Sequence, residues 1–212
     1  MRNEISQATI SRLPLYLRTL GFAEAEGTEI ISSDEFGRRL NITPEQIRKD
    51  LASFGQFGKK GVGYYVTELK NRIAKILGFE NNWNVAIVGM GHLGDALAHY
   101  KKIPELGFNL VALFDVDKKR IGSKVNGIDV SDVANLKEKL AELNVQIVII
   151  AVPTEAAQEI VDALEGTTVR GIWNFAPINV QAPKGIRIVH EDLTVGLGSL
   201  SYHISQNWNP EG

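Results

Sequence analysis

A glycine pattern at residues 89–94 constrains the fold of this chain more than any other feature. Residues 85–94 read Val-Ala-Ile-Val-Gly-Met-Gly-His-Leu-Gly, so Gly89, Gly91 and Gly94 match G-x-G-x-x-G directly after an apolar run. In this fingerprint the first glycine permits a tight turn, the second lets the backbone approach a pyrophosphate, and the third lets a helix pack against the strand. The helix N-terminus then faces the phosphates. The pattern predicts the strand, turn and helix that open a Rossmann-type domain.

Asp115 extends this prediction to the choice of nucleotide. It lies 21 residues beyond Gly94, at the end of the apolar run 109–114. A carboxylate there accepts hydrogen bonds from a ribose 2′-hydroxyl and repels a 2′-phosphate, which favours NAD(H) over NADP(H). The basic run 118–120 is a complication, since it could receive a phosphate. The position of Asp115 is set by the strand end and weighs more, although a turn or cap role stays open for it.

The rest of the C-terminal half alternates apolar strands with helical patterns. Strands are predicted at 84–88, 109–114, 145–152, 171–175 and 186–189, with helices such as 93–102 and 132–143 between them. Such alternation predicts a parallel sheet covered on both faces, with ligands at the carboxyl ends of the strands. The predicted cofactor-binding residues are Gly89, Met90, Gly91, His92, Leu93, Gly94, Asp115, Val116, Val152, Pro153, Asn174, Ala176 and Pro177. The alternative for the last strand ends is that their prolines only terminate strands.

The N-terminal half is predicted to be helical. An apolar stripe from Ile10 to Leu20 indicates a first helix, which Gly21 would end. Ser32 and Glu35 have capping-box spacing, and Thr43-Pro44 with Gln46 is a stronger start signal. Helices at 33–40 and 43–53, joined by the turn at 41–42, form a predicted helix-turn-helix. A strand at 62–66 and a last helix at 68–77 complete the domain.

The second helix of this pair would lie in the major groove of DNA, and the turn at 58–61 would be a wing. Arginine grips guanine through two hydrogen bonds, and lysine pairs with phosphate. Residues 36–75 hold nine basic and three acidic side chains although the whole chain has a net charge of −2. The predicted DNA-contacting residues are Gln46, Arg48, Lys49, Ser53, Lys59, Lys60, Gly61 and Tyr64. The alternative is an ordinary helical hairpin with solvated charges.

Composition excludes several other classes. The chain has no cysteine, which excludes disulfides and thiolate metal sites, and we expect no bound metal. No apolar run is long enough for a membrane helix, and the start lacks a signal-peptide core, so a cytoplasmic protein is expected.

Only 36 residues follow Ala176, too few for a substrate domain, and the four histidines have no relay partner at a recognisable spacing. We therefore expect no catalytic residue and no enzyme. Two alternatives stay open: a small NAD-dependent oxidoreductase with an accessory helical domain, and a CoA- or nucleotide-binding interaction module.

The chain resembles the Rex family of redox-sensing transcriptional repressors over essentially its whole length. The residues that carry the resemblance are Ile10-Ser11-Arg12-Leu13, Tyr16-Leu17-Arg18, Ile47-Arg48-Lys49-Asp50-Leu51, Phe54-Gly55, Gly61-Val62-Gly63-Tyr64, Gly89 to Gly94, Phe114-Asp115, Val152-Pro153, Asn174-Phe175-Ala176-Pro177 and Asp192-Leu193. The resemblance implies an α/β chain with a winged-helix domain at 1–80, a Rossmann NAD(H)-binding domain at 81–191 and a dimerisation helix at 192–212 that is exchanged between subunits.

The resemblance also implies a function. A homodimer would bind palindromic operators of fermentation and respiration genes while NAD⁺ is bound, and NADH would release it. Arg18, Tyr100 and Asp192 match the switch residues of the family, with Asp192 pairing with Arg18 in one state and Tyr100 in the other. A helix N-cap is the plainer role for Asp192, and a packed helix residue for Tyr100.

Overall fold

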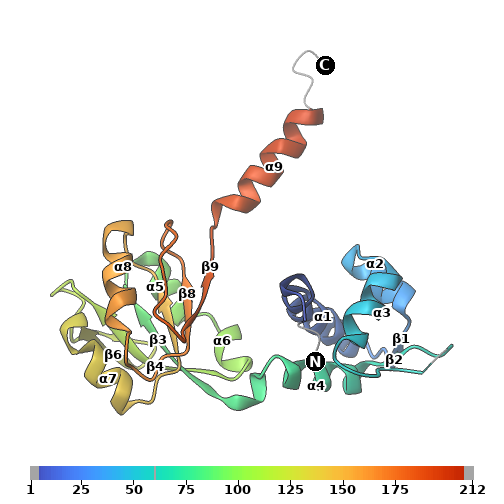
Figure 1. Ribbon diagram of the computed structural model, residues 1–212, viewed down its shortest axis with the longest axis horizontal. Coiled ribbons are helices and arrows are strands. Elements are labelled where there is room, and N and C mark those ends of the chain that lie inside the picture. Colours follow the sequence, from blue (N-terminus) through green and yellow to red (C-terminus); the bar gives the residue numbers. More distant parts are fainter. Residues whose placement is uncertain (1–4, 60, 208–212) are drawn as a thin grey trace. The chain divides into compact units, whose positions relative to one another are not determined.

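The computed structural model describes residues 5–59 and 61–207, and the chain divides into two compact units, Met1–Asn81 and Asn82–Gly212 (Figure 1). The first unit is mainly helical. Its elements are α1 (Gln7–Ala25), β1 (Ile30–Ile31), α2 (Ser33–Leu40), α3 (Pro44–Ala52), β2 (Tyr64–Tyr65), α4 (Val66–Ile76) and the short 3₁₀ helix Phe79–Asn81.

Local capping fixes the ends of α2 and α3 as the sequence predicts. The Ser32 hydroxyl accepts a hydrogen bond from the backbone N–H of Glu35, and that of Thr43 accepts one from Gln46. Between the helices Asn41 takes the left-handed conformation, with φ 54°, which lets the chain reverse within a few residues. The predicted helix pair and its turn are confirmed.

Two predictions for this unit are wrong. Gly21 does not end the first helix, because Leu20 and Ala23 are fully buried on the face that also buries Tyr16. That packing outweighs the roughly 1 kcal/mol that a glycine costs inside a helix. The strand predicted at 62–66 shrinks to Tyr64–Tyr65, because β2 pairs only with the two residues of β1 and Val66 already begins α4.

The second unit is a doubly wound sheet. Its strands are β3 (Trp83–Val88), β4 (Phe108–Asp115), β5 (Lys124–Val125), β6 (Ile128–Asp132), β7 (Ile147–Ile150), β8 (Gly171–Asn174) and β9 (Arg187–His190). Among the described residues they form one seven-stranded sheet in the order β5-β6-β4-β3-β7-β8-β9, with every pair parallel except β5 and β6. Apart from β5, this is the Rossmann order, and the predicted parallel sheet is confirmed. The hairpin β5–β6 was not predicted.

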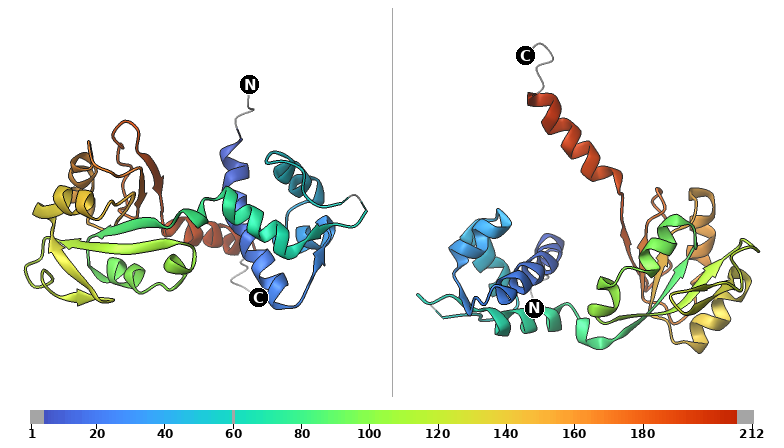
Figure 2. Two further views of the ribbon diagram at one scale, coloured as in Figure 1. Left: turned by 90° about the horizontal axis from the view of Figure 1, so that it is seen from below. Right: turned by 180° about the vertical axis from the view of Figure 1, so that it is seen from behind.

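Helices cover both faces of this sheet, as its apolar strands require. Their bounds are α5 (His92–Ala98), α6 (Lys102–Glu105), the 3₁₀ helix Val133–Asn135, α7 (Leu136–Glu142) and α8 (Thr154–Ala163). Leu140 of α7 and Val161 of α8 pack with Val88 on one face. Ala98 of α5 and Ile103 of α6 pack with Ile87 on the other face. The layers of helix on the two faces of the sheet can be followed in Figure 2.

The helix predicted at 93–102 is interrupted. α5 ends at Ala98 and α6 begins only at Lys102. Pro104 explains the break, since it has no N–H for the carbonyl of Tyr100 and its ring would clash there.

The last element, α9 (Thr194–Asn207), confirms the predicted helical tail. Every described side chain from Val189 to Gln206 is exposed in the single chain. Within residues 5–59 and 61–207, no helix is both long enough and apolar enough to span a membrane.

Candidate nucleic-acid interface and dinucleotide site

The approach of α2 to α3 depends on Gly37. A Cβ at this position would lie 2.5 Å from the carbonyl oxygen of Ile42 in the turn between the helices. Ile47 and Leu51 of α3 then pack in the core with Phe36 of α2. This packing leaves the opposite side of α3 exposed.

The exposed side of α3 carries two of the predicted DNA-contacting residues, Arg48 and Lys49, and a third, Ser53, is the exposed C-cap of the helix. In the free chain the Arg48 guanidinium donates to the Ser33 hydroxyl at 2.7 Å and to the Glu45 carboxylate at 2.7 Å. An exposed ion pair of this kind is worth little in water, so it leaves the arginine available to a nucleic acid.

A cleft of about 530 Å³ adjoins this side of α3. Arg48 lines it on the helix, and Lys59 and Gly61 line it from the turn before β2. The turn is closed by the backbone N–H of Lys59, which donates to the carbonyl of Gly63 at 2.9 Å. These two cations and one carboxylate, Asp34, line the cleft, so its lining has a net positive charge, which suits phosphate.

Two other predicted DNA-contacting residues, Tyr64 and Lys60, differ from those on the exposed side of α3. Tyr64 is only 8 % exposed and packs in the core of the first unit, and it also lines the cleft. The aromatic ring follows the alternation of β2, whose first residue faces inward. Lys60 lies outside the described residues.

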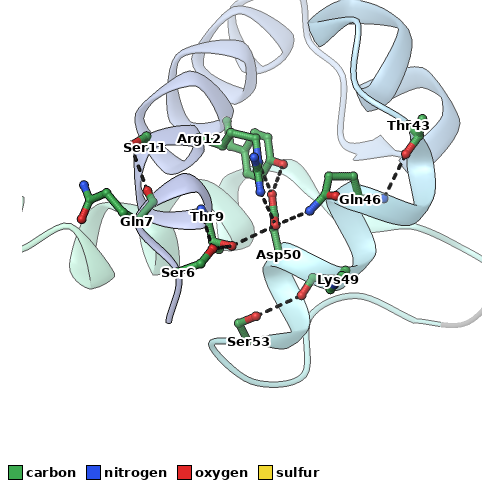
Figure 3. Close-up of polar contacts among 11 residues, drawn as sticks. Ser6, Gln7, Thr9, Ser11, Arg12, Thr43, Gln46, Lys49, Asp50 and Ser53 are labelled. Atoms are coloured by element: carbon green, nitrogen blue, oxygen red, sulfur yellow. Dashed lines mark hydrogen bonds and ion pairs between the residues drawn. The ribbon is translucent and has the colours of Figure 1, made fainter. Parts of the chain in front are cut away.

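The side chain of Gln46 belongs to a buried polar cluster that the sequence analysis did not predict (Figure 3). Its side-chain amide donates to Asp50, a carboxylate that is 1 % exposed on the inner side of α3. Asp50 also accepts hydrogen bonds from α1: from the Arg12 guanidinium at 2.5 and 2.8 Å, from the Tyr16 hydroxyl at 2.6 Å and from the Thr9 hydroxyl at 3.2 Å. We call these five residues the Asp50 cluster.

The Asp50 cluster keeps its carboxyl group ionised. Burial by itself raises the pKa of Asp50, but hydrogen bonds from Arg12, Tyr16 and Gln46 outweigh it and hold this pKa at about 2. Burial, together with the bond to Asp50, raises the pKa of Tyr16. The hydrogen bond to Asp50 raises the pKa of Arg12 further. The cluster therefore contains one anion and one cation that attach α1 to α3.

A sequence signal for this cluster exists. Thr9, Arg12 and Tyr16 recur at helical spacing beside buried Leu13, and Asp50 falls between Ile47 and Leu51 on the inner side of its helix. A charged residue on an apolar stripe indicates a buried partner, because an unpaired buried charge is strongly destabilising. Which helix supplies the partner is not encoded in that spacing.

The glycine loop at 89–94 has the geometry of a phosphate-binding turn. Gly89 has φ 95°, and a Cβ there would lie 2.5 Å from the carbonyl oxygen of Ala151. A Cβ on Gly94 would lie 1.9 Å from the carbonyl oxygen of Gly89, so this glycine lets α5 pack against the turn. A Cβ on Gly91 would meet nothing within 4 Å. The first and third glycines serve the fold, and the second leaves open space beside the backbone.

Asp115 lies beside this loop at the end of β4. Its Oδ2 accepts a hydrogen bond from the Met90 backbone N–H at 2.6 Å, and its Oδ1 accepts one from Asp117 at 2.8 Å. The Met90 side chain is fully buried, while His92 is exposed and Leu93 half-buried at the start of α5. Val116 is 75 % exposed. The carboxylate thus holds the loop in the free chain.

The carboxyl ends of β7 and β8 lie along the same edge of the sheet, since these strands run parallel to β3. Val152 is half-buried and Pro153 exposed after β7, and Pro177 is exposed after β8. Asn174 is fully buried, and its amide nitrogen donates to the carbonyls of Ala176 and Ile178. Its side chain shapes the loop at 174–178 and is not available to a ligand in this structure.

The residues matched to the family's switch occur in both units. Arg18 is exposed on α1 in the first unit, and Tyr100 is 57 % exposed after α5 in the second. Asp192 accepts hydrogen bonds from the backbone and the hydroxyl of Thr194 at 2.8 and 2.6 Å, and these bonds lower its pKa. Asp192 therefore bonds to Thr194, the first residue of α9, in the free chain.

Within residues 5–59 and 61–207, no group of three or more histidine or acidic side chains is arranged to hold a metal ion.

Comparison with known families covers both units. The family described as "CoA binding domain" matches residues 80–178, and the family described as "Putative DNA-binding protein N-terminus" matches residues 4–52. Among curated proteins, the redox-sensing transcriptional repressor Rex of Roseiflexus sp. (strain RS-1) is 40 % identical over 206 residues, which cover 97 % of this chain and 94 % of that protein. The Rex repressor of Carboxydothermus hydrogenoformans is 43 % identical over 204 residues, covering 96 % and 98 % of the two chains.

Solved structures give the same result. RSP, a Rex-family repressor, has been solved in complex with NAD⁺ and operator DNA; the likeness has a TM-score of 0.91 at 36 % identity and covers 97 % of this chain and 94 % of that one. Its complex with NADH matches with a TM-score of 0.89 at 34 % identity, over 96 % and 95 % of the two chains.

Proposed function

This chain belongs to the Rex family of redox-sensing transcriptional repressors, and we propose that it binds operator DNA as a homodimer and is released when NADH binds. The family consists of transcriptional repressors, in agreement with the expectation that the chain is not an enzyme. The observation that carries the proposal is the likeness over nearly the whole chain to one repressor solved both with NAD⁺ and operator DNA and with NADH. Because a repressor of this kind must reach chromosomal DNA, we propose that this protein is located in the cytoplasm.

The helical unit, as a winged helix, would supply the DNA contacts. Arg48 and Lys49 on α3 would enter the major groove, and Lys59 on the turn would reach the backbone or the minor groove. Ser53 and Gly61 belong to the same proposed interface, together with Lys60. The positive lining of the cleft between α3 and the turn supports this arrangement.

The sheet unit would bind the dinucleotide along the carboxyl ends of its strands. The pyrophosphate would lie over Gly91, where the backbone faces open space, and Asp115 would accept from the ribose hydroxyls. Exposed Pro153 and Pro177 would border the nicotinamide. A ligand shifts the DNA-binding equilibrium only by its differential affinity for the two states, so NADH must bind the released state more tightly than it binds the DNA-binding state.

The exposed helix α9 supports the proposed dimer. Leu197, Leu200 and Ile204 of this helix, with Leu193 just before it, form one apolar stripe, and in the single chain these side chains are about half or more exposed, Ile204 at 49 %. Val195 and Tyr202 are also exposed, on the opposite side of the helix. A helix of 14 residues is marginal in water without packing. We propose that this stripe is buried by a second copy of the chain, with α9 exchanged between subunits, and that two copies match the two halves of a palindromic operator.

The proposed switch transfers Asp192 between partners. In one state its carboxylate would pair with Arg18, and in the other with the Tyr100 hydroxyl. The present bonds to Thr194 are local and weak enough to be exchanged. An Asp192→Ala variant is expected to keep its NADH affinity and to lose NADH-driven release of DNA; unchanged release would refute the switch.

One experiment tests the proposed function. Binding of a fluorescent palindromic operator duplex is followed by anisotropy at fixed salt, while NADH is titrated against a constant NAD⁺ background. Release at low NADH and retention in excess NAD⁺ are expected. DNA binding that ignores NADH would refute the sensor, and absence of DNA binding would refute the repressor.

The "CoA binding domain" match favours a second candidate ligand for the sheet unit. The same titration is therefore repeated with CoA. Release by CoA and not by NADH would assign the glycine loop to CoA.

A further inference from the structure

The side-chain amide of Gln46 is held in a single orientation by Asp50. Its Nε2 lies 2.7 Å from Asp50 Oδ1. The nitrogen and oxygen of an amide are hard to tell apart by shape, but an ionised carboxylate only accepts hydrogen bonds. Because the Arg12 guanidinium pairs with Asp50 at 2.5 and 2.8 Å and keeps it ionised, the NH₂ group of Gln46 must face the carboxylate and the carbonyl oxygen must face away.

The carbonyl oxygen of Gln46 is in contact with solvent. Within residues 5–59 and 61–207 it accepts no hydrogen bond, and no buried side-chain oxygen or nitrogen in that part of the chain lacks a partner. An unpartnered atom that is absent from the buried set must be accessible. Gln46 stands in the first turn of α3, and Lys49 and Ser53 follow it at helical spacing on the same edge.

We propose that Gln46 is a specificity-determining residue that presents an acceptor to the major groove, and that Asp50 is its positioning residue. The major-groove donors are the amino groups of adenine and cytosine, whereas guanine and thymine offer acceptors at the corresponding edge. The second hydrogen of the Gln46 amide remains for N7 of adenine, so adenine is the better match. This inference rests on the proposed binding of operator DNA.

The free protein already contains this orientation. Arg12, Tyr16 and Thr9 hold Asp50 from α1, so the carboxylate is fixed before any DNA arrives. A glutamine without such a partner would rotate its amide to suit either kind of base edge. Because the amide is fixed in advance, its carbonyl oxygen would face an acceptor atom of guanine or thymine, and two acceptors repel each other.

The experiment starts from duplexes that the wild-type chain selects from a random palindromic library. Each adenine in the half-site is replaced in turn by purine, and each cytosine by 2-pyrimidinone, which removes only the amino group. Binding is measured by anisotropy for wild type, Gln46→Met and, as a control, Gln7→Met. Gln7 is an exposed glutamine on α1, and its side chain makes none of the bonds of the Asp50 cluster.

At one base of the half-site, removal of the amino group is expected to lower the affinity of wild type and of Gln7→Met by about five- to tenfold, which corresponds to the loss of one hydrogen bond. Gln46→Met is expected to bind the two duplexes equally. Wild-type indifference at every adenine and cytosine, or a full loss in Gln46→Met, would overturn the inference. Failure of wild type to select any sequence would instead overturn DNA binding and this inference with it.

Asp50→Asn tests the positioning role. An asparagine accepts as well as donates, so the Gln46 amide is freed to turn. The preference of wild type for an amino base over guanine or thymine at that position is expected to shrink several-fold, while other positions keep theirs. An equal loss on all duplexes would mean that Asp50 only holds the fold. Circular dichroism checks the helices, and if this variant does not fold, the Gln46→Met measurements decide.

Discussion

Asp115 Oδ2 accepts a hydrogen bond from the Met90 backbone N–H at 2.6 Å, which links the end of β4 to the turn that follows β3. The residue proposed to bind the ribose therefore also shapes the loop proposed to bind the pyrophosphate. A ligand that takes one oxygen of this carboxylate leaves the other for the backbone.

Replacement of Asp115 by alanine is expected to lower NADH affinity at least tenfold and to reduce discrimination against NADPH, because both the ribose acceptor and the repulsive charge are lost. Isothermal titration with NADH and NADPH measures this. Asp129→Ala is the control, since Asp129 is exposed on β6 and lies 3.8 Å from Lys124 at the surface. Equal losses in the two variants would contradict a specific role for Asp115.

The glycines of the loop are expected to separate binding from stability. Gly91→Ala adds a methyl group to open space, so its melting temperature should stay near wild type while NADH binding is lost by obstruction of the pyrophosphate. Gly94→Ala places a Cβ 1.9 Å from the carbonyl oxygen of Gly89 and should destabilise the sheet unit by about 1–3 kcal/mol. Thermal unfolding and NADH titration of both variants check this. NADH binding by a stable Gly91→Ala protein would show that the dinucleotide does not approach this backbone.

The stability of the first unit is expected to depend on acid through Asp50. Its pKa falls from 3.8 to about 2 on folding, so ionisation contributes stability above pH 4 that is lost as the pH falls towards 2. The shift corresponds to about 2 kcal/mol. Carbon NMR of the Asp50 carboxyl measures its pKa, and denaturation at pH 5 and pH 2.5 compares wild type with Asp50→Asn. An equal acid sensitivity of the two proteins would disprove the assignment.

Charges placed in the apolar stripe of α9 are expected to abolish the dimer. Leu197→Asp and Leu200→Asp each put a carboxylate where the proposed interface buries a leucine. Ser199→Asp adds the same charge on the other side of the helix. Light scattering after gel filtration should give a dimer for wild type and Ser199→Asp and a smaller species for the leucine variants. Dimers in all four proteins would place the interface elsewhere.

Local sequence determined the elements whose signals lie within a few residues. The caps at Ser32 and Thr43, the turn at Asn41 and the glycine loop follow from short-range sterics and hydrogen bonding, and the sequence predicts each of them. The parallel sheet followed from apolar strands separated by helices. Two predictions are wrong because residues far away in the sequence decide the outcome. The first helix continues through Gly21 because its neighbours are buried, and the strand predicted at 62–66 is short because β1 offers only two residues for pairing.

Only the tertiary structure decided which polar side chains meet. The sequence supplied Gln46 as a base-contacting candidate and Asp50 as part of a family motif. It did not show that Asp50 makes hydrogen bonds to Tyr16, Arg12 and Thr9, which precede it by 34 to 41 residues. Likewise Asp115 was predicted from its strand end, but its bond to Met90 requires β3 and β4 to be neighbours in register. Periodicity specifies which face of an element is buried, whereas partners across the core are fixed only when the faces pack together.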